Sequence, residues 1–175
     1  MWVFGYGSLI WNPGFAFDAR EIARLDGYSR SFCMRSIHHR GTEADPGLVL
    51  ALDADPAASC DGVAFRVAEG QEEATLAYLR ERELISSAYL ERDIRVETAT
   101  LGTLDALAYV IDADHVQYCG GLPLEEQAQI IARSHGGRGP NWEYLYNTAD
   151  HLAEIGLHDA DLMWLRTRVG EILNL

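Results

Sequence analysis

The spacing of apolar residues changes along this chain from a strand pattern to a helix pattern, and this change most constrains the fold. Short apolar and aromatic stretches with interleaved polar residues predict β-strands. These expected strands cover residues 2–5, 25–34, 48–52, 62–67, 89–98 and 104–111. Pro56 and the small polar residues around it predict a turn between the third and the fourth of them.

Helical spacing is concentrated in the last third of the chain, with one earlier helix expected at residues 72–84. Residues 124–135 form the next expected helix, and Asn141 and Asp159 are expected to cap two more. Strands first and helices last indicate an α+β protein, a small mixed β-barrel or sheet with flanking helices. The length of 175 residues fits a single domain over residues 1–175.

The charge of the chain narrows the classes of partner. Its formal net charge is −13, from 14 basic and 27 acidic residues. Nucleic acid and anionic membranes attract basic surfaces, so neither is an expected partner. A small anionic substrate would also be repelled at long range, and an anion site would therefore need backbone N–H groups or a few well-placed arginines. No obligate protein partner is expected.

The three cysteines, Cys33, Cys60 and Cys119, are widely spaced and odd in number, which favours reduced thiols over a disulfide framework. The first residues lack a basic segment and are interrupted by glycines, so they do not resemble a signal peptide. No apolar run approaches the roughly 20 residues that span a bilayer. We expect a soluble cytoplasmic protein.

A glycine-rich turn, Gly5-Tyr6-Gly7-Ser8, follows the first expected strand. Its backbone N–H groups are candidates for binding an anion. Ile10 stands where a dinucleotide fingerprint needs its third glycine, and no Gly-Lys-Ser/Thr of a phosphate-binding loop follows. From spacing alone, an ordinary tight turn is the alternative.

Glu83 is the carboxylate with the clearest catalytic context. Leu76, Leu79 and Glu83 are spaced i, i+3 and i+7, so Glu83 is expected on the apolar side of its helix. A carboxyl group that is partly removed from water has a raised pKa, which suits general acid/base catalysis near neutral pH. The alternative is a helix-end glutamate paired with Arg80, one turn back.

Other kinds of active site find little support. The six histidines include no HExxH motif and no compact cluster with carboxylates, so no metal site is expected. Ser8 lies in GYGSL, which is not the GxSxG turn of serine hydrolases. The glycines at residues 136–139 indicate a connector or a substrate lid. The aromatic residues after them, Tyr144 included, are expected in the core or in the wall of a cleft.

Four segments together resemble the ChaC-type γ-glutamylcyclotransferase family, in the family's order and over most of the chain. They are WVFGYGSLIWNP at 2–13, HRG at 39–41 with Pro46-Gly47, YLRERE at 78–83 with Tyr89, and NWEYL at 141–145.

The resemblance implies a definite activity. Family members cleave glutathione to 5-oxoproline and cysteinylglycine by an intramolecular attack that needs no cofactor. The resemblance gives Glu83 the acid/base role and places Tyr144 in the substrate cleft. It also implies that the backbone of one loop holds the γ-glutamyl group; the loop consists of Val3, Phe4, Gly5, Tyr6, Gly7, Ser8 and Leu9.

One segment departs from part of the family. Some members carry Gly-Gly-Tyr shortly after the catalytic glutamate, whereas residues 84–89 here read LISSAY. This difference bears on the substrate preference. Two other functions stay open: a cyclotransferase for other γ-glutamyl amino acids or amines, and a non-catalytic binding protein that keeps the pocket, against which the presence of Glu83 speaks. Arg35, Ser36 and Arg40 are candidates for contacts to the glycine carboxylate of glutathione.

Overall fold

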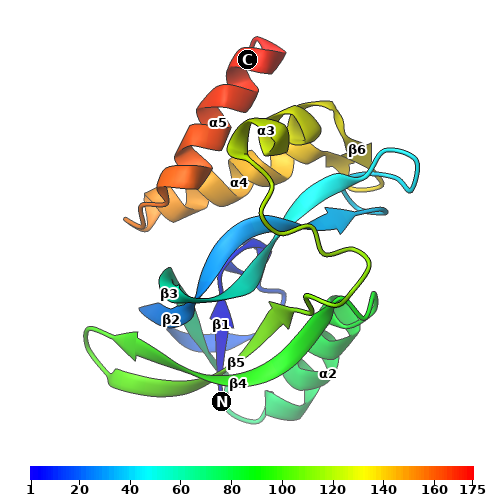
Figure 1. The fold of residues 1–175 in the computed structure, drawn as a ribbon. Helices are drawn as coiled ribbons and strands as arrows, with labels where there is room; N and C mark the ends of the chain where they lie inside the picture. Colours follow the sequence, from blue (N-terminus) through cyan, green and yellow to red (C-terminus); the bar gives the residue numbers. More distant parts are fainter. The chain divides into compact units, whose positions relative to one another are not determined.

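A computed structural model describes residues 1–175. Its elements follow one another in this order: β1 (Trp2–Gly5), α1 (Ser8–Trp11), β2 (Phe17–Ser36), β3 (Gly47–Val67), α2 (Glu72–Glu83), β4 (Tyr89–Thr98), β5 (Gly102–Ile111), α3 (Leu124–Arg133), β6 (His135–Gly136), β7 (Gly139–Pro140), α4 (Asn141–Glu154) and α5 (Ala160–Leu173) (Figure 1). This composition confirms the α+β class. None of the helices is long and apolar enough to cross a membrane.

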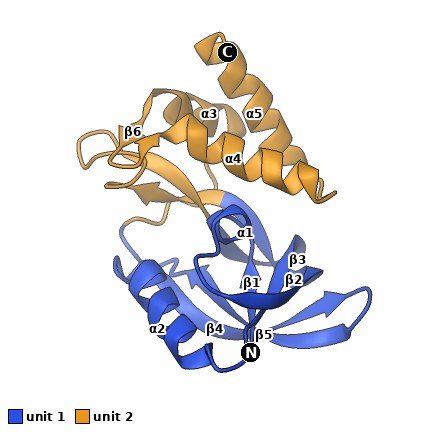
Figure 2. Ribbon diagram, turned by 180° about the vertical axis from the view of Figure 1, so that it is seen from behind, with its two compact units in different colours: residues 1–31, 51–116 blue, residues 32–50, 117–175 orange.

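The chain divides into two compact units, each built from two separate segments (Figure 2). Residues 1–31 and 51–116 form one, here called the barrel unit. Residues 32–50 and 117–175 form the other, here called the helical unit. The two long strands β2 and β3 each contribute to both units, so the chain passes between the units within regular strands.

The sheet is a closed barrel with the strand order β1-β3-β2-β4-β5. Short β1 pairs antiparallel with β3, Val3 opposite Phe65, and parallel with β5, Val3 opposite Leu107. β4 and β5 form a regular antiparallel hairpin from Tyr89–Ile111 to Thr98–Gly102. The expected barrel with flanking helices is therefore confirmed, and closure leaves β1 without a free edge.

Helix α2 lies against the barrel through a compact apolar cluster. Buried Leu79 of α2 packs in this cluster with Val3 of β1, Val67 of β3 and Tyr109 of β5, and Leu9 of α1 completes it. Because α2 is held at Leu79, the next turn of the helix carries Glu83 to the same side. The expected placement of Glu83 toward the apolar side is confirmed.

The turn expected at Pro56 is wrong, because β3 continues as one strand through this residue. Proline has no N–H to donate, but it is tolerated in a strand where that position faces solvent. Residues 54–57 are exposed, so Pro56 costs no buried hydrogen bond. The side chain of Asp55 instead accepts a hydrogen bond from the N–H of Ala57 at 3.0 Å.

In the helical unit, one predicted cap is confirmed and one is wrong. Asp159 caps α5, its side chain accepting from the N–H of Leu162 at 3.0 Å. Asn141 is instead the first residue of α4, with no exposed surface. Its side-chain oxygen accepts from the N–H of Leu48 and its amide donates to the carbonyl of Leu48, both at 2.8 Å. Asn141 therefore ties α4 to β3.

The helix expected at residues 124–135 ends at Arg133, because Ser134 is extended and His135 pairs with Pro140 in the β6–β7 hairpin.

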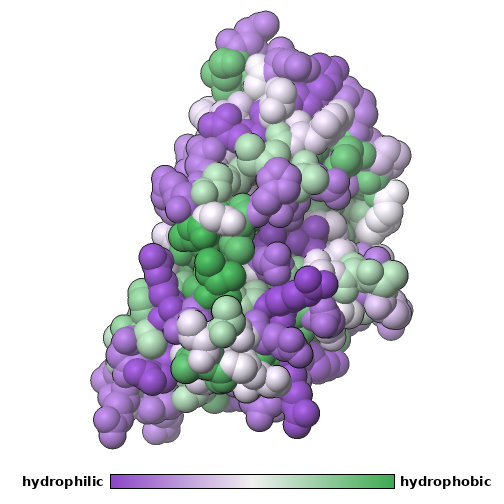
Figure 3. Space-filling model, turned by 90° about the vertical axis from the view of Figure 1, so that its left-hand side faces the viewer, coloured by the Kyte–Doolittle hydropathy of each residue, from purple (hydrophilic) through white to green (hydrophobic).

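On the face drawn in Figure 3, hydrophilic residues cover most of the surface and hydrophobic residues gather in smaller groups, in keeping with the high acidic content.

Candidate active site

The glycine-rich loop joins β1 to α1 in the barrel unit, and buried side chains hold it at both ends. Val3 and Phe4 have no exposed surface, so they serve as core residues. A Cβ added to Gly5 would lie 3.1 Å from the Cβ of Leu9 and 3.2 Å from the ring of Phe65, which shows how closely the loop is packed. The loop therefore has little room for a side chain at Gly5, where it presents its backbone.

Arg30 of β2 also holds the loop in place. The Nε of Arg30 donates to the carbonyl oxygen of Tyr6 at 2.7 Å, and its Nη2 donates to the carbonyl of Asp61. Arg30 thus uses only carbonyl oxygens, and the N–H groups of the loop near α1 remain as possible donors to an anion. The N–H of Ile10 donates to the carbonyl of Gly7 at 2.9 Å, whereas the first N–H groups of a helix have no acceptor within the helix. Ser8 and Leu9 are thus the candidates for anion contacts.

Glu83 is the last residue of α2, and its side chain is mostly buried, with 16% exposed. Its Oε1 lies 3.3 Å from the Nε of Arg82, whose side chain is 15% exposed. Arg80 is not the partner that a helix-end pairing would require. Its Nε and Nη2 instead donate to both carboxylate oxygens of Glu91 on β4, at 3.0 and 2.9 Å. The carboxylate of Glu83 therefore lies beside Arg82 and not beside Arg80.

A buried tyrosine stands near this carboxylate. Tyr109 on β5 is 2% exposed, and its hydroxyl donates to Oε1 of Glu91 at 2.9 Å. Burial, this hydrogen bond and the charges of Glu91 and Glu83 raise the pKa of Tyr109 well above its usual range. Tyr109 therefore stays a neutral hydrogen-bond donor. The sequence did not single out Tyr109, Glu91 or Arg82, because the apolar pattern of β5 and the charges of α2 do not tell which side chains meet.

Arg82 connects the helix that carries Glu83 to the glycine-rich loop. Its Nη2 donates to the hydroxyl of Ser8 at 3.0 Å, and its Nη1 donates to the carbonyl of Asn12 at 2.6 Å. The structure thus brings together Glu83 and the loop, which the sequence had identified separately.

Tyr144 lies in the helical unit. Its hydroxyl accepts a hydrogen bond from the N–H of Leu50 at 3.2 Å, and its ring packs edge-on against Phe32 at 6.1 Å. Arg40 of the same unit donates to the carbonyl of Pro140 at 3.1 Å and lies 3.3 Å from Glu143. The expectation that Tyr144 and Arg40 contact substrate stays a prediction.

The segment after Glu83 has a glycine-like backbone without a glycine. Ser87 has φ of 60°, in the left-handed region that favours glycine. This is where LISSAY replaces the Gly-Gly-Tyr of some family members. Ser87 adopts this conformation with a side chain present, and Ile85, two residues before it, is 78% exposed.

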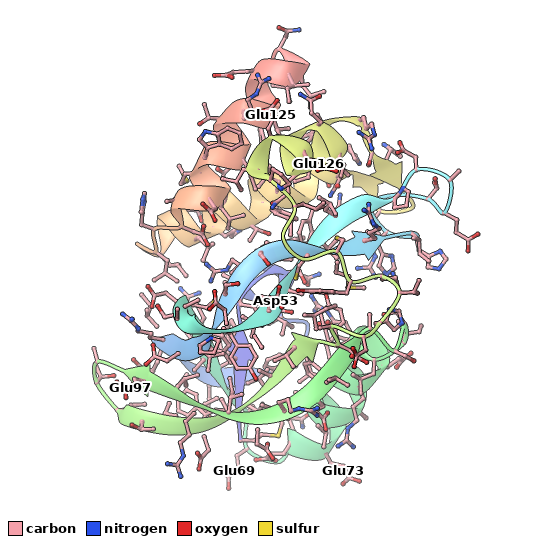
Figure 4. The ribbon with its side chains drawn as sticks, in the orientation of Figure 1. Asp53, Glu69, Glu73, Glu97, Glu125 and Glu126 are labelled. Atoms are coloured by element: carbon pink, nitrogen blue, oxygen red, sulfur yellow. The ribbon has the colours of Figure 1, made fainter.

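No group of three or more His, Cys, Asp or Glu side chains is placed to hold a metal ion. Figure 4 labels acidic residues of the barrel unit that lie apart from one another, such as Glu73 on α2 and Glu97 on β4. None of the three cysteines forms a disulfide, and burial raises the pKa of Cys119.

The sequence matches the model of the family described as ChaC-like protein over residues 1–172. The chain belongs to the ChaC-like family. Among its relatives is the glutathione-specific gamma-glutamylcyclotransferase of Escherichia coli, 34% identical over 99% of this chain and 74% of that protein. Human glutathione-specific gamma-glutamylcyclotransferase 1 is 35% identical over 99% of this chain and 80% of its own length.

A solved structure supports the assignment of this chain to the ChaC-like family. The glutathione-specific γ-glutamyl cyclotransferase from yeast superposes with a TM-score of 0.85, at 26% sequence identity. The match covers 98% of this chain and 96% of the yeast chain. The ChaC-like fold is therefore shared over nearly the full length, and the resemblance inferred from four motifs is confirmed.

Proposed function

We propose that this ChaC-like chain is a γ-glutamylcyclotransferase that converts glutathione to 5-oxoproline and cysteinylglycine. The observation that carries the proposal is the meeting of Glu83 and the glycine-rich loop in the barrel unit, where Arg82 contacts both. The names of the relatives support glutathione as the substrate.

The reaction is an internal displacement. The α-amino group of the glutamyl residue attacks its own γ-carbonyl carbon, a C–N bond closes the five-membered ring, and the C–N bond to cysteine breaks. Both reacting groups belong to one molecule, so the protein needs no nucleophile or cofactor and only has to select the attacking conformer.

Two protons must move during this reaction, and one carboxylate can move both. Glu83 takes the first proton from the α-ammonium group, because only the free amine is nucleophilic, and passes it to the departing amine of cysteinylglycine. The attacking nitrogen still carries one proton too many after the ring closes, and this second proton leaves through Glu83 as well, so that the products are the neutral ring amide and the ammonium form of cysteinylglycine. The buried setting of Glu83 limits competition from water for these protons.

Negative charge appears on the γ-carbonyl oxygen and is already present on the α-carboxylate. Backbone N–H groups of the loop from Val3 to Leu9, chiefly those of Ser8 and Leu9, are proposed to bind these oxygens. A neutral backbone site can bind a carboxylate in a protein whose net charge is −13. Tyr144 is also proposed to contact the substrate.

The proposed setting is the cytoplasm, where glutathione is abundant and thiols stay reduced. The acidic composition speaks against nucleic acid and anionic membranes as partners. No protein partner is required by the proposed reaction, since one chain supplies both the acid/base and the loop.

The test is incubation of the purified protein with glutathione, without added metal, followed by quantification of both products. We expect 5-oxoproline and cysteinylglycine in equal amounts. Glu83→Gln keeps the shape of the side chain but removes its proton transfer, so turnover should fall at least about 100-fold. Glu81→Gln, at an exposed position of the same helix, is the matched control and should retain activity.

Other outcomes would assign other functions. A substantially active Glu83→Gln variant would refute the acid/base role. Turnover of γ-glutamyl amino acids or amines in preference to glutathione would favour a cyclotransferase for those substrates. Ser86 and Ser87, which stand where some family members have glycines, are the reason to test them. Glutathione binding without any product would favour a binding protein.

A further inference from the structure

Arg82 makes more directed contacts than an arginine on a helix surface needs. Its Nη1 donates to the carbonyl oxygens of Asn12 at 2.6 Å and Pro13 at 3.2 Å, and to the hydroxyl of Tyr78 at 3.0 Å. Its side chain is only 15% exposed. A guanidinium that is largely removed from water is stable only when its donors are satisfied, so these contacts define one orientation.

The segment that receives these donors is packed tightly on α2. Gly14 has φ of 75°, and a Cβ added to it would lie 2.0 Å from the hydroxyl oxygen of Tyr78. The chain can therefore pass over α2 only with glycine at this position. Arg82 and Tyr78, four residues apart on one face of α2, form the surface on which residues 12–14 rest.

The remaining donors of Arg82 face the two parts of the proposed active site. Nη2 donates to the hydroxyl of Ser8 at 3.0 Å, at the start of α1. Nε lies 3.3 Å from Oε1 of Glu83. One planar group thus touches the loop proposed to bind the γ-glutamyl group and the carboxylate proposed to move its protons.

We propose that Arg82 is a positioning residue that holds the Glu83 carboxylate and the Ser8–Pro13 segment in a single arrangement. The inference rests on the proposed function of Glu83. Arg82 acts through these groups, because its Nη1 and Nη2 already donate to protein atoms and its Nε lies beside the Glu83 carboxylate. Cyclisation depends on the carboxylate lying at a fixed distance from an amine whose position the loop determines, so an error in their separation lowers the rate.

Lysine cannot replace this arginine. Its ammonium carries the same charge but only three donors at one point, whereas the guanidinium directs five donors within one plane. Arg82→Lys therefore separates charge from geometry. If charge beside Glu83 were sufficient, the lysine variant would keep its activity.

The experiment measures kcat and KM for glutathione in wild type, Arg82→Lys and Arg82→Ala. We expect kcat to fall about 100-fold in Arg82→Ala, the scale of a misplaced catalytic group, and about 10-fold or more in Arg82→Lys. Added guanidinium ion should restore part of the lost kcat in Arg82→Ala, with saturation, whereas uncharged urea at the same concentration should not. Arg24→Ala is the matched control, because Arg24 lies in the same unit in an exposed pair with Asp26, and it should behave as wild type.

Three results would overturn the proposal. The first is an Arg82→Lys variant with wild-type kcat and KM. The second is a loss of kcat in both variants that matches the unfolded fraction measured by circular dichroism and is not rescued by guanidinium. The third is absence of product from wild type, in which case the proposed function fails and the role of Arg82 in it fails too. In the first two results wild type remains active, so the two failures are distinguishable.

Discussion

Replacing Tyr109 with phenylalanine should weaken the fold at neutral pH and should remove part of its sensitivity to alkali. The hydroxyl of Tyr109 donates to Oε1 of Glu91 at 2.9 Å inside the barrel unit. Hydrogen bonds to charged groups contribute about 1.5–3 kcal/mol. Glu91 keeps both contacts from Arg80 in the variant, so it is not left without a partner. We therefore expect the lower end, a loss of about 1.5 kcal/mol in the free energy of unfolding.

The dependence on pH follows from the raised pKa of Tyr109. The unfolded tyrosine ionises near its ordinary value of 10.0, whereas the folded one stays neutral to higher pH because it is buried and faces carboxylates. The stabilisation is thus complete below pH 10 and is lost as the pH rises above it. One such group costs about 1.4 kcal/mol for each pH unit above its unfolded pKa. The difference in the free energy of unfolding between wild type and Tyr109→Phe should therefore nearly vanish at about pH 11.

The assay is urea unfolding of both proteins between about pH 8 and pH 11, followed by circular dichroism. The other titrating groups are common to the two proteins and cancel in the difference when they act independently. Absorbance of tyrosinate in the folded proteins gives a second measure, since wild type and variant should show the same absorbance near pH 10. A constant gap in stability over this range would refute the reasoning, and so would an additional tyrosine that ionises near pH 10 in folded wild type.

Two further predictions concern the helical unit. Asn141→Asp places a carboxylate oxygen against the Leu48 carbonyl in a site with no exposure, and should lower the free energy of unfolding by more than about 2 kcal/mol. Thermal denaturation measures this loss. Asn174→Asp, at the end of α5, is the control and should lower the free energy of unfolding far less; equal losses in the two variants would contradict this account. Hydrogen bonds from Arg168 and Gln129 lower the pKa of Glu125 to about 2, so the stabilisation by Glu125 is present above its usual pKa of 4.5 and is lost as the pH falls toward 2. Arg168→Gln should raise this pKa in an NMR titration, and an unchanged value would exclude Arg168 as the cause.

Local pattern was enough to predict most of the elements. The strand at residues 89–98 is observed with the same bounds, and the helix expected at 72–84 ends one residue earlier. These elements follow from the spacing of apolar residues, which the backbone geometry of a helix or strand dictates over a few residues. The side of α2 on which Glu83 lies follows from the same spacing.

Features that depend on distant residues could not be predicted in this way. Asn141 has the side chain of a helix cap, yet its partner is Leu48, 93 positions earlier. Pro56 resembles a turn residue, yet β3 continues because that part of the strand faces solvent. In both cases the local preference is weak compared with the hydrogen bonds and solvent exposure that the folded chain provides.

The candidate site divides in the same way. The sequence by itself determined the residue types, a carboxylate on the inner face of α2 and a glycine-rich loop after β1. Only the tertiary structure decided that they meet, because Arg82 reaches Ser8 across 74 positions and Tyr109 reaches Glu91 across the β4–β5 hairpin. Barrel closure brings these segments together, and a contact between distant segments leaves no periodic trace in the sequence of either one.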